Sequence, residues 1–177
     1  MEKSLFQDKR IVIFDLESTN NNPETAEIVQ FAARKFENNK LISKKNILIK
    51  VETKLNHDFI DRTRITEGLL EQKALLKKDA FPEILKFISS DTLISYKGNV
   101  MHFKLLWKYL NKRLKNPTLD VVDVADMLGI IDDTENISLP KLASLLGIEF
   151  DAKRWNNADY DVKIIEKIWF KLKSKME

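Results

Sequence analysis

The chain has 177 residues, of which 44% are hydrophobic and 32% are charged, and its formal net charge is +3 at pH 7. The length suits one domain with a proper core, over residues 1–177. The absence of cysteine excludes disulfide bonds, thiolate metal ligands and a cysteine nucleophile. The sequence shows no secretory signal and no membrane-length apolar run, so we expect a cytoplasmic protein without a membrane partner.

Three strands are expected in the first third of the chain. They cover residues 10–16, 28–36 and 41–51, and residues 37–40 form the turn of a hairpin between the last two. Short helices follow over residues 57–77. A further helix at 80–88 carries Pro82 in its first turn, where proline is tolerated.

Strands then alternate with helices. Strands are expected at residues 92–96 and 119–124, and a helix at 99–114. A second helix is capped by Ser138, has Pro140 early in it and ends at Gly147. Antiparallel strands followed by strands that alternate with helices predict an α/β fold, a mixed sheet flanked by helices.

Two acidic residues end the first strand. Side chains alternate across a strand, so Asp15 and Glu17 leave the same face after an apolar run. Such a pair must be hydrated, protonated or bound to a cation. The alternative interpretation is a strand that simply stops in the polar turn at residues 18–23.

The last helix supplies a third acidic residue. Asn156 or Asn157 is a suitable N-cap, and an apolar stripe with helical spacing follows. Asp161 precedes Ile165 by four residues and therefore points with that stripe toward the core, whereas Asp159 does not. Alternatively, Asp161 only favours the positive end of the helix dipole.

These two ends of the chain predict one metal site. If the first strand is central in the sheet and the last helix packs across it, Asp15, Glu17 and Asp161 converge. Carboxylate oxygens suit Mg²⁺ or Mn²⁺. A divalent ion held in this way activates water and neutralises charge on a phosphodiester.

The motifs resemble those of the DEDD-type 3′-to-5′ exonucleases, in the branch of the proofreading epsilon subunit of DNA polymerase III and of RNase T. Residues 14–20, F-D-L-E-S-T-N, resemble the first motif, F-D-x-E-T-T-G, and residues 156–161, N-N-A-D-Y-D, resemble the third, H-x-A-x-x-D. Five further segments follow in family order at residues 27–33, 63–66, 79–83, 121–124 and 139–147. The resemblance implies a ribonuclease H-like fold over residues 10–172.

Two family positions are changed. The family's second motif, roughly H-N-x-x-F-D, supplies a fourth acid, but alignment on Asn99 puts Phe103 there and a shift of one residue puts His102 there. No acid occurs between Asp91 and Asp120. We therefore expect one well-formed metal site and a damaged second one. His102 would suit Mn²⁺ or Zn²⁺ as a neutral imidazole, or it is a surface or capping residue.

The family's general-base histidine corresponds to Asn156, and an amide cannot take a proton near neutral pH. The same resemblance implies substrate contacts at Ser18, Thr19 and Asn99. Stacking of an unpaired base is a possible role for Phe103, Tyr96 and Trp155, with core packing as the alternative. Phosphate contacts are a possible role for Arg64, Lys97 and Arg154, with solvated charge as the alternative.

Three hypotheses about function remain open. The first is a metal-dependent exonuclease acting on nucleic-acid 3′ ends in proofreading, repair or RNA trimming, for which we expect a single-stranded substrate. The second is a degenerate homologue that binds nucleic-acid ends or a DNA polymerase subunit without cutting. The third is a structural or interaction protein that has kept only the fold.

Overall fold

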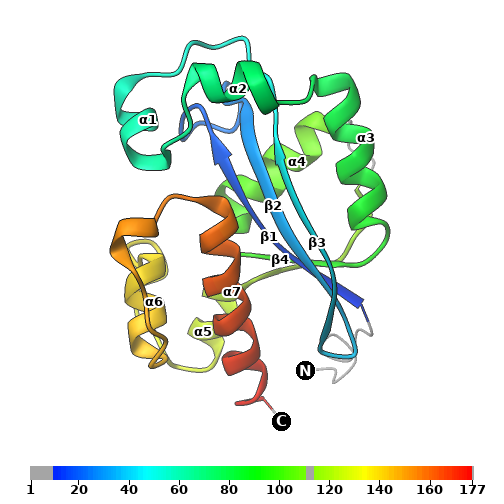
Figure 1. Cartoon of the computed structure of the whole chain (residues 1–177). Coiled ribbons are helices and arrows are strands. Elements are labelled where there is room, and N and C mark those ends of the chain that lie inside the picture. Colours follow the sequence, from blue (N-terminus) through cyan, green and yellow to red (C-terminus); the bar gives the residue numbers. More distant parts are fainter. Residues whose placement is uncertain (1–9, 111–113, 177) are drawn as a thin grey trace.

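The computed structural model describes residues 10–110 and 114–176. Its centre is a five-stranded sheet of order β3-β2-β1-β4-β5 (Figure 1). The strands are β1 (Arg10–Ser18), β2 (Ile28–Glu37), β3 (Lys40–Leu48), β4 (Thr92–Ser95) and β5 (Thr118–Asp120). The first three strands are antiparallel, whereas β4 runs parallel to β1 and β5 parallel to β4. This confirms the predicted mixed sheet.

Helices cover both faces of the sheet. Figure 1 shows α5, α6 and α7 on one side, α3 and α4 on the other, and α1 and α2 near the carboxyl end of β1. The α-helices are α1 (His57–Thr63), α2 (Glu67–Lys73), α3 (Lys77–Ile88), α4 (Phe103–Tyr109), α5 (Val121–Met127), α6 (Leu139–Leu145) and α7 (Ala158–Lys173). A π-helix, η2 (Gly98–His102), precedes α4, and a 3₁₀-helix, η3 (Ala152–Arg154), precedes α7. No helix in the described ranges is long and apolar enough to cross a membrane.

Strand β1 separates the two halves of the core. Ile11 and Ile13 join the cluster under α5, α6 and α7, whereas Val12 and Phe14 join the cluster under α3 and α4. This alternation is the two-residue period of a strand buried on both faces. It places Asp15 and Glu17, which share the parity of Ile13, on the face that α7 covers.

The strand predicted at residues 119–124 is wrong beyond Asp120. The Asp120 side chain accepts a 3.0 Å hydrogen bond from the N–H of Val122, which makes Asp120 the N-cap of α5. The valines that follow, β-branched and typical of strands, are instead buried on α5 against the core. A local cap and helical burial outweigh strand propensity here.

The helix predicted at residues 99–114 begins as the π-helix η2 and continues as α4, and its residues 111–113 lie outside the described part of the chain. Close packing explains the glycine before it. A Cβ on Gly98 would lie 2.5 Å from Cε2 of Phe103. The Phe103 ring therefore rests directly on the Gly98 backbone.

Candidate metal centre

Three carboxylates from β1 and α7 meet at one point. Asp15, Glu17 and Asp161 are buried, and each offers an oxygen within 4.8 Å of the other two. The strand alternation described above turns the first two toward α7. Helix α7 begins at Ala158, after the N-cap Asn157, so Asp161 lies in its first turn on the inward face. The predicted convergence of the two ends of the chain is present.

Mutual repulsion and burial disfavour three charges at this point. Burial, together with the charges of Asp161 and Glu17, raises the pKa of Asp15 well above its usual range. Burial and Asp161 raise the pKa of Glu17 to about 8, although Arg62 opposes the shift. Burial raises the pKa of Asp161 to about 7, although the backbone N–H groups of Asn156 and Asn157 oppose it. A cation between the three groups would relieve this cost.

The donor set fits a hard divalent ion. Oδ1 of Asp161 is buried and accepts no hydrogen bond from the described residues, while Oδ2 accepts one of 3.0 Å from the N–H of Asn156. One oxygen of Asp161 is thus fixed by the backbone and the other is left for a ligand. Oxygen ligands of this kind suit Mg²⁺ or Mn²⁺.

The three carboxylates open onto a cavity of about 310 Å³. Its wall includes Ser18 at the end of β1, Asn21 after it, and Val100, Met101 and His102 of η2. Asn156 and Trp155 line it from the segment before α7. The cavity therefore lies between the carboxyl end of β1 and the amino ends of two helices.

The structure places His102 at the cavity and Phe103 in the core. His102 lines the cavity, and its Nδ1 lies 2.8 Å from Oγ of Ser95 and 3.6 Å from Oδ1 of Asp15. Burial lowers the pKa of His102 to about 4, so its imidazole is neutral. Phe103 is buried, and its ring centroid lies 5.7 Å from that of Phe14 in the core. The alignment that puts Phe103 at the position of the family's acid does not fit this placement. A role for Phe103 in stacking an unpaired base does not fit it either.

Two further residues that were expected to contact substrate make hydrogen bonds within the protein instead. Oγ1 of Thr19 accepts a 3.0 Å hydrogen bond from the N–H of Glu27, and Thr19 is buried. The Asn99 amide donates to Asp123 at 2.6 Å, and its backbone N–H donates to Asp120 at 3.2 Å. Neither residue is part of the cavity wall. Ser18 does line the cavity, and its hydroxyl donates to the carbonyl oxygen of Asn20.

The basic residues at the cavity differ from those expected. Lys97 lines it, as expected, and its Nζ donates to the Glu135 carbonyl oxygen at 2.7 Å. Arg64 is instead the left-handed C-cap residue of α1, and Arg154 packs over the Tyr160 ring at 4.4 Å, so neither is part of the wall. Arg62, in the last turn of α1, does line the cavity. The sequence pattern held no signal that singled out Arg62 from its neighbours.

Two aromatic residues considered for stacking do reach the cavity. Trp155 is 40% exposed, and its ring packs edge-on against Phe150 at 6.3 Å between centroids. Tyr96 is half-buried, and its hydroxyl donates to the carbonyl oxygen of Ile137 at 2.6 Å. Trp155 is therefore partly accessible at the cavity, whereas Tyr96 is held in the wall.

The sheet order and its helical layers define a ribonuclease H-like fold. The chain belongs to the exonuclease family, because the RNase T family model matches residues 12–169. This match confirms the resemblance to the DEDD-type 3′-to-5′ exonucleases that the motifs carried.

Known proteins agree with this assignment. The chain is 24% identical over 180 residues to DNA polymerase III PolC-type of Mycoplasma genitalium, covering 99% of this chain and 12% of that protein. It is 26% identical over 130 residues to the PolC-type enzyme of Thermotoga maritima, covering 72% of this chain and 9% of that protein. The chain thus spans about a tenth of the length of these relatives.

Solved structures share the fold. E. coli exonuclease I in complex with a dA16 oligonucleotide gives a TM-score of 0.79 at 15% identity, covering 94% of this chain and 41% of that one. The zinc-bound form of the E. coli enzyme with single-stranded DNA gives 0.76 at 16% identity, covering 90% and 39%.

Proposed function

We propose that the protein is a metal-dependent exonuclease that removes nucleotides from the 3′ end of single-stranded DNA. The observation that carries this proposal is the group of three buried carboxylates at the floor of an open cavity. A cavity of about 310 Å³ is at the small end of ligand sites and suits one nucleotide rather than a duplex. The family membership and the single-stranded DNA in the E. coli structures support the same class of substrate.

The roles of the residues follow from their positions. Asp15, Glu17 and Asp161 would hold the metal. A bound divalent ion supplies an activated water and neutralises charge on the scissile phosphate. Arg62 and Lys97 bring positive charge to the same cavity and would attract the phosphate backbone.

Proton transfer is the weak step in this site. Asn156 lines the cavity but has no titratable group. Among the described residues of the wall the imidazole is that of His102, and burial that lowers its pKa to about 4 makes it a poor base. Loss of a general base typically costs a factor of about 10² to 10⁴ in rate. We therefore expect slow turnover.

The same two positions favour a second candidate function. The resemblance implies a general-base histidine at Asn156 and an acid at His102. Because neither group is present, the protein would bind a 3′ end without cutting it. The similarity to PolC-type DNA polymerases supports a role beside a DNA polymerase, in proofreading or repair, for either candidate.

Digestion of a single-stranded oligodeoxynucleotide, labelled at its 5′ end, tests the two candidates in Mg²⁺ and in Mn²⁺. The nuclease predicts successive shortening from the 3′ end that is lost in Asp15→Asn. Asp159→Asn is the matched control, since Asp159 lies on the same turn of α7 as Asp161, its side chain is 44% exposed and it pairs with Lys163 at 2.6 Å. No shortening in either metal, with a retained electrophoretic shift, would establish the binding protein instead. No shortening and no shift would leave a protein that has kept only the fold.

A further inference from the structure

A polar loop follows directly on the strand that carries Asp15 and Glu17. It joins β1 to β2 over residues 19–27, and its Asn21 lines the cavity beside Ser18. Its neck is closed by two hydrogen bonds of 3.0 Å between Thr19 and Glu27, one from each backbone N–H. The loop therefore contributes Asn21 to the cavity wall, and its position determines where Asn21 lies.

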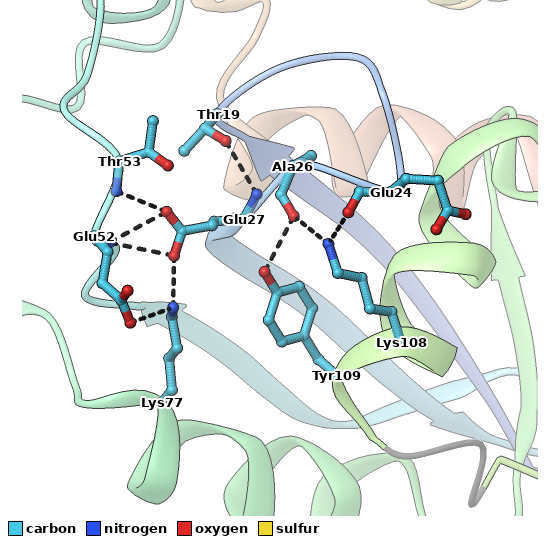
Figure 2. A network of polar contacts seen from close by, with 9 residues as sticks. All are labelled: Thr19, Glu24, Ala26, Glu27, Glu52, Thr53, Lys77, Lys108 and Tyr109. Carbon is cyan, nitrogen blue, oxygen red and sulfur yellow. Dashed lines mark hydrogen bonds and ion pairs between the residues drawn. The ribbon is translucent and has the colours of Figure 1, made fainter.

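Lys108 of α4 binds the outer side of this loop. Its Nζ donates to the carbonyl oxygens of Glu24 at 2.7 Å, Ala26 at 3.1 Å and Pro23 at 3.3 Å. Tyr109, the next residue, donates from its hydroxyl to the same Ala26 oxygen at 3.1 Å. Figure 2 shows Lys108 and Tyr109 reaching the loop from α4. A single ammonium group thus uses its three donors on three carbonyls of one loop.

The neck of the loop is held separately. The Glu27 carboxylate accepts hydrogen bonds from the N–H groups of Glu52 and Thr53 and pairs with Lys77 at 2.5 Å (Figure 2). These contacts fix the start of β2. They do not reach residues 20–25, so the outer part of the loop depends on its own internal turns and on Lys108.

Helix α4 connects the loop to another segment of the cavity wall. It continues from η2, whose Val100, Met101 and His102 also line the cavity. Tyr109 also stacks on Phe81 of α3, with 4.9 Å between ring centroids, which anchors the end of α4. Lys108 therefore connects the 19–27 loop, which carries Asn21, to the helix that continues from η2.

We infer that Lys108 is a positioning residue for the 3′-terminal nucleotide: by holding the 19–27 loop against α4, it sets the place of Asn21 in the cavity wall. The inference rests on the proposed function, since it concerns the affinity of the same cavity. Lys108 does not line the cavity. Its removal should weaken binding of the strand end while leaving the carboxylate site intact.

The test is Lys108→Met, which keeps the length of the side chain and removes its donors. Lys104→Met is the matched control, one turn earlier on α4 and exposed. Binding of a 5′-fluorescein single-stranded oligodeoxynucleotide is followed by anisotropy in Ca²⁺, and KM and kcat are measured in Mn²⁺. We expect a roughly tenfold rise in Kd and KM for Lys108→Met, with kcat within about twofold of wild type. Tyr109→Phe, which loses one hydrogen bond, should show a smaller rise.

Hydrogen exchange of residues 19–27 gives a readout that needs no nuclease activity. Exchange should increase in Lys108→Met and not in Lys104→Met. A wild-type Kd together with unchanged exchange in folded Lys108→Met would overturn the inference. If wild type binds the oligonucleotide but never shortens it, the nuclease proposal fails while the binding comparison still decides the role of Lys108. If the wild-type protein does not bind the oligonucleotide, both the proposed function and the role of Lys108 are overturned.

Discussion

The backbone N–H of Asn156 donates a hydrogen bond of 3.0 Å to Oδ2 of Asp161. Asn156 has a φ of 60°, a left-handed conformation that asparagine and histidine adopt more readily than most residues. Its backbone thus orients the third carboxylate while its side chain faces the cavity. The side chain at this position can be exchanged without losing that contact.

Restoring a base and an acid should raise nuclease activity. In the double variant Asn156→His with His102→Asp, an imidazole at the cavity can accept a proton, and a carboxylate beside Asp15 adds a metal ligand. We expect at least about a hundredfold gain in the initial rate of 3′ digestion in Mg²⁺, the size of a typical general-base effect. The rate is measured on the 5′-labelled strand at saturating protein.

Phe103→Asp is the control for this experiment. Because Phe103 packs on Phe14 and on the Gly98 backbone, a carboxylate there should destabilise the fold by about 3 kcal/mol or more and give no gain in rate. The double variant of Asn156→His with Phe103→Asp is compared with that of Asn156→His with His102→Asp. A higher digestion rate in the first and no gain in the second would contradict the placement of the two side chains.

The metal-free protein should become more stable as the pH falls from about 8 to about 5. Glu17 has a pKa of about 8 in the folded state against 4.5 ordinarily, and the pKa values of Asp15 and Asp161 are raised as well. The folded state therefore binds protons in this range that the unfolded state has released, so stability is gained as they bind. Urea unfolding in EDTA across this range measures the slope.

Metal should remove that slope, because ions and protons compete for the same oxygens. Titration calorimetry with Mn²⁺ near pH 7, in buffers of different ionisation enthalpy, should show net proton release. Asp161→Asn should abolish the release and raise the metal-free stability at pH 8 by on the order of 1 kcal/mol. Asp159→Asn should change neither quantity.

Acid should destabilise the protein through a different carboxylate. Burial raises the pKa of Glu27, but hydrogen bonds from Lys77 and Thr53 outweigh it and lower the pKa to about 2. The stabilisation from Glu27 is complete above about pH 4.5 and is lost as the pH falls to about 2, since the unfolded state takes up the proton first. Glu27→Gln should remove on the order of 2 kcal/mol at neutral pH and flatten this window. Glu52→Gln should have little effect, because Glu52 is 90% exposed although it also pairs with Lys77.

The two-residue period of β1 and the four-residue spacing in α7 were sufficient to predict the carboxylate site. Both are local rules, and the three groups meet once β1 is central in the sheet and α7 packs across it. The hairpin turn is also local: Asn38 and Asn39 both have positive φ, as the turn at residues 37–40 requires. The direction of each carboxylate and the shape of the turn were predictable because each follows from chemistry within a few residues.

Other features depend on how distant elements pack. An error of one residue in a helix rotates the expected face by about 100°, which separates cavity-lining His102 from buried Phe103. Arg62 reaches the cavity because of where α1 sits near the end of β1, and no pattern within residues 57–66 encodes that. Val121 and Val122 have strand propensity, but Asp120 starts a helix there.

Arg62 should contribute to the affinity for single-stranded DNA. Its side chain lines the cavity, and its charge is close enough to oppose the rise in the pKa of Glu17, so a phosphate bound near the carboxylates would lie within its reach. Arg62→Gln should raise the Kd for a single-stranded oligodeoxynucleotide roughly tenfold and reduce the slope of log Kd against log salt by about 0.7. Arg64→Gln is the matched control, since Arg64 is two residues away and exposed but outside the cavity wall. Anisotropy over a range of NaCl concentrations in Ca²⁺ measures both quantities, and equal losses in the two variants would mean that Arg62 acts only as general surface charge.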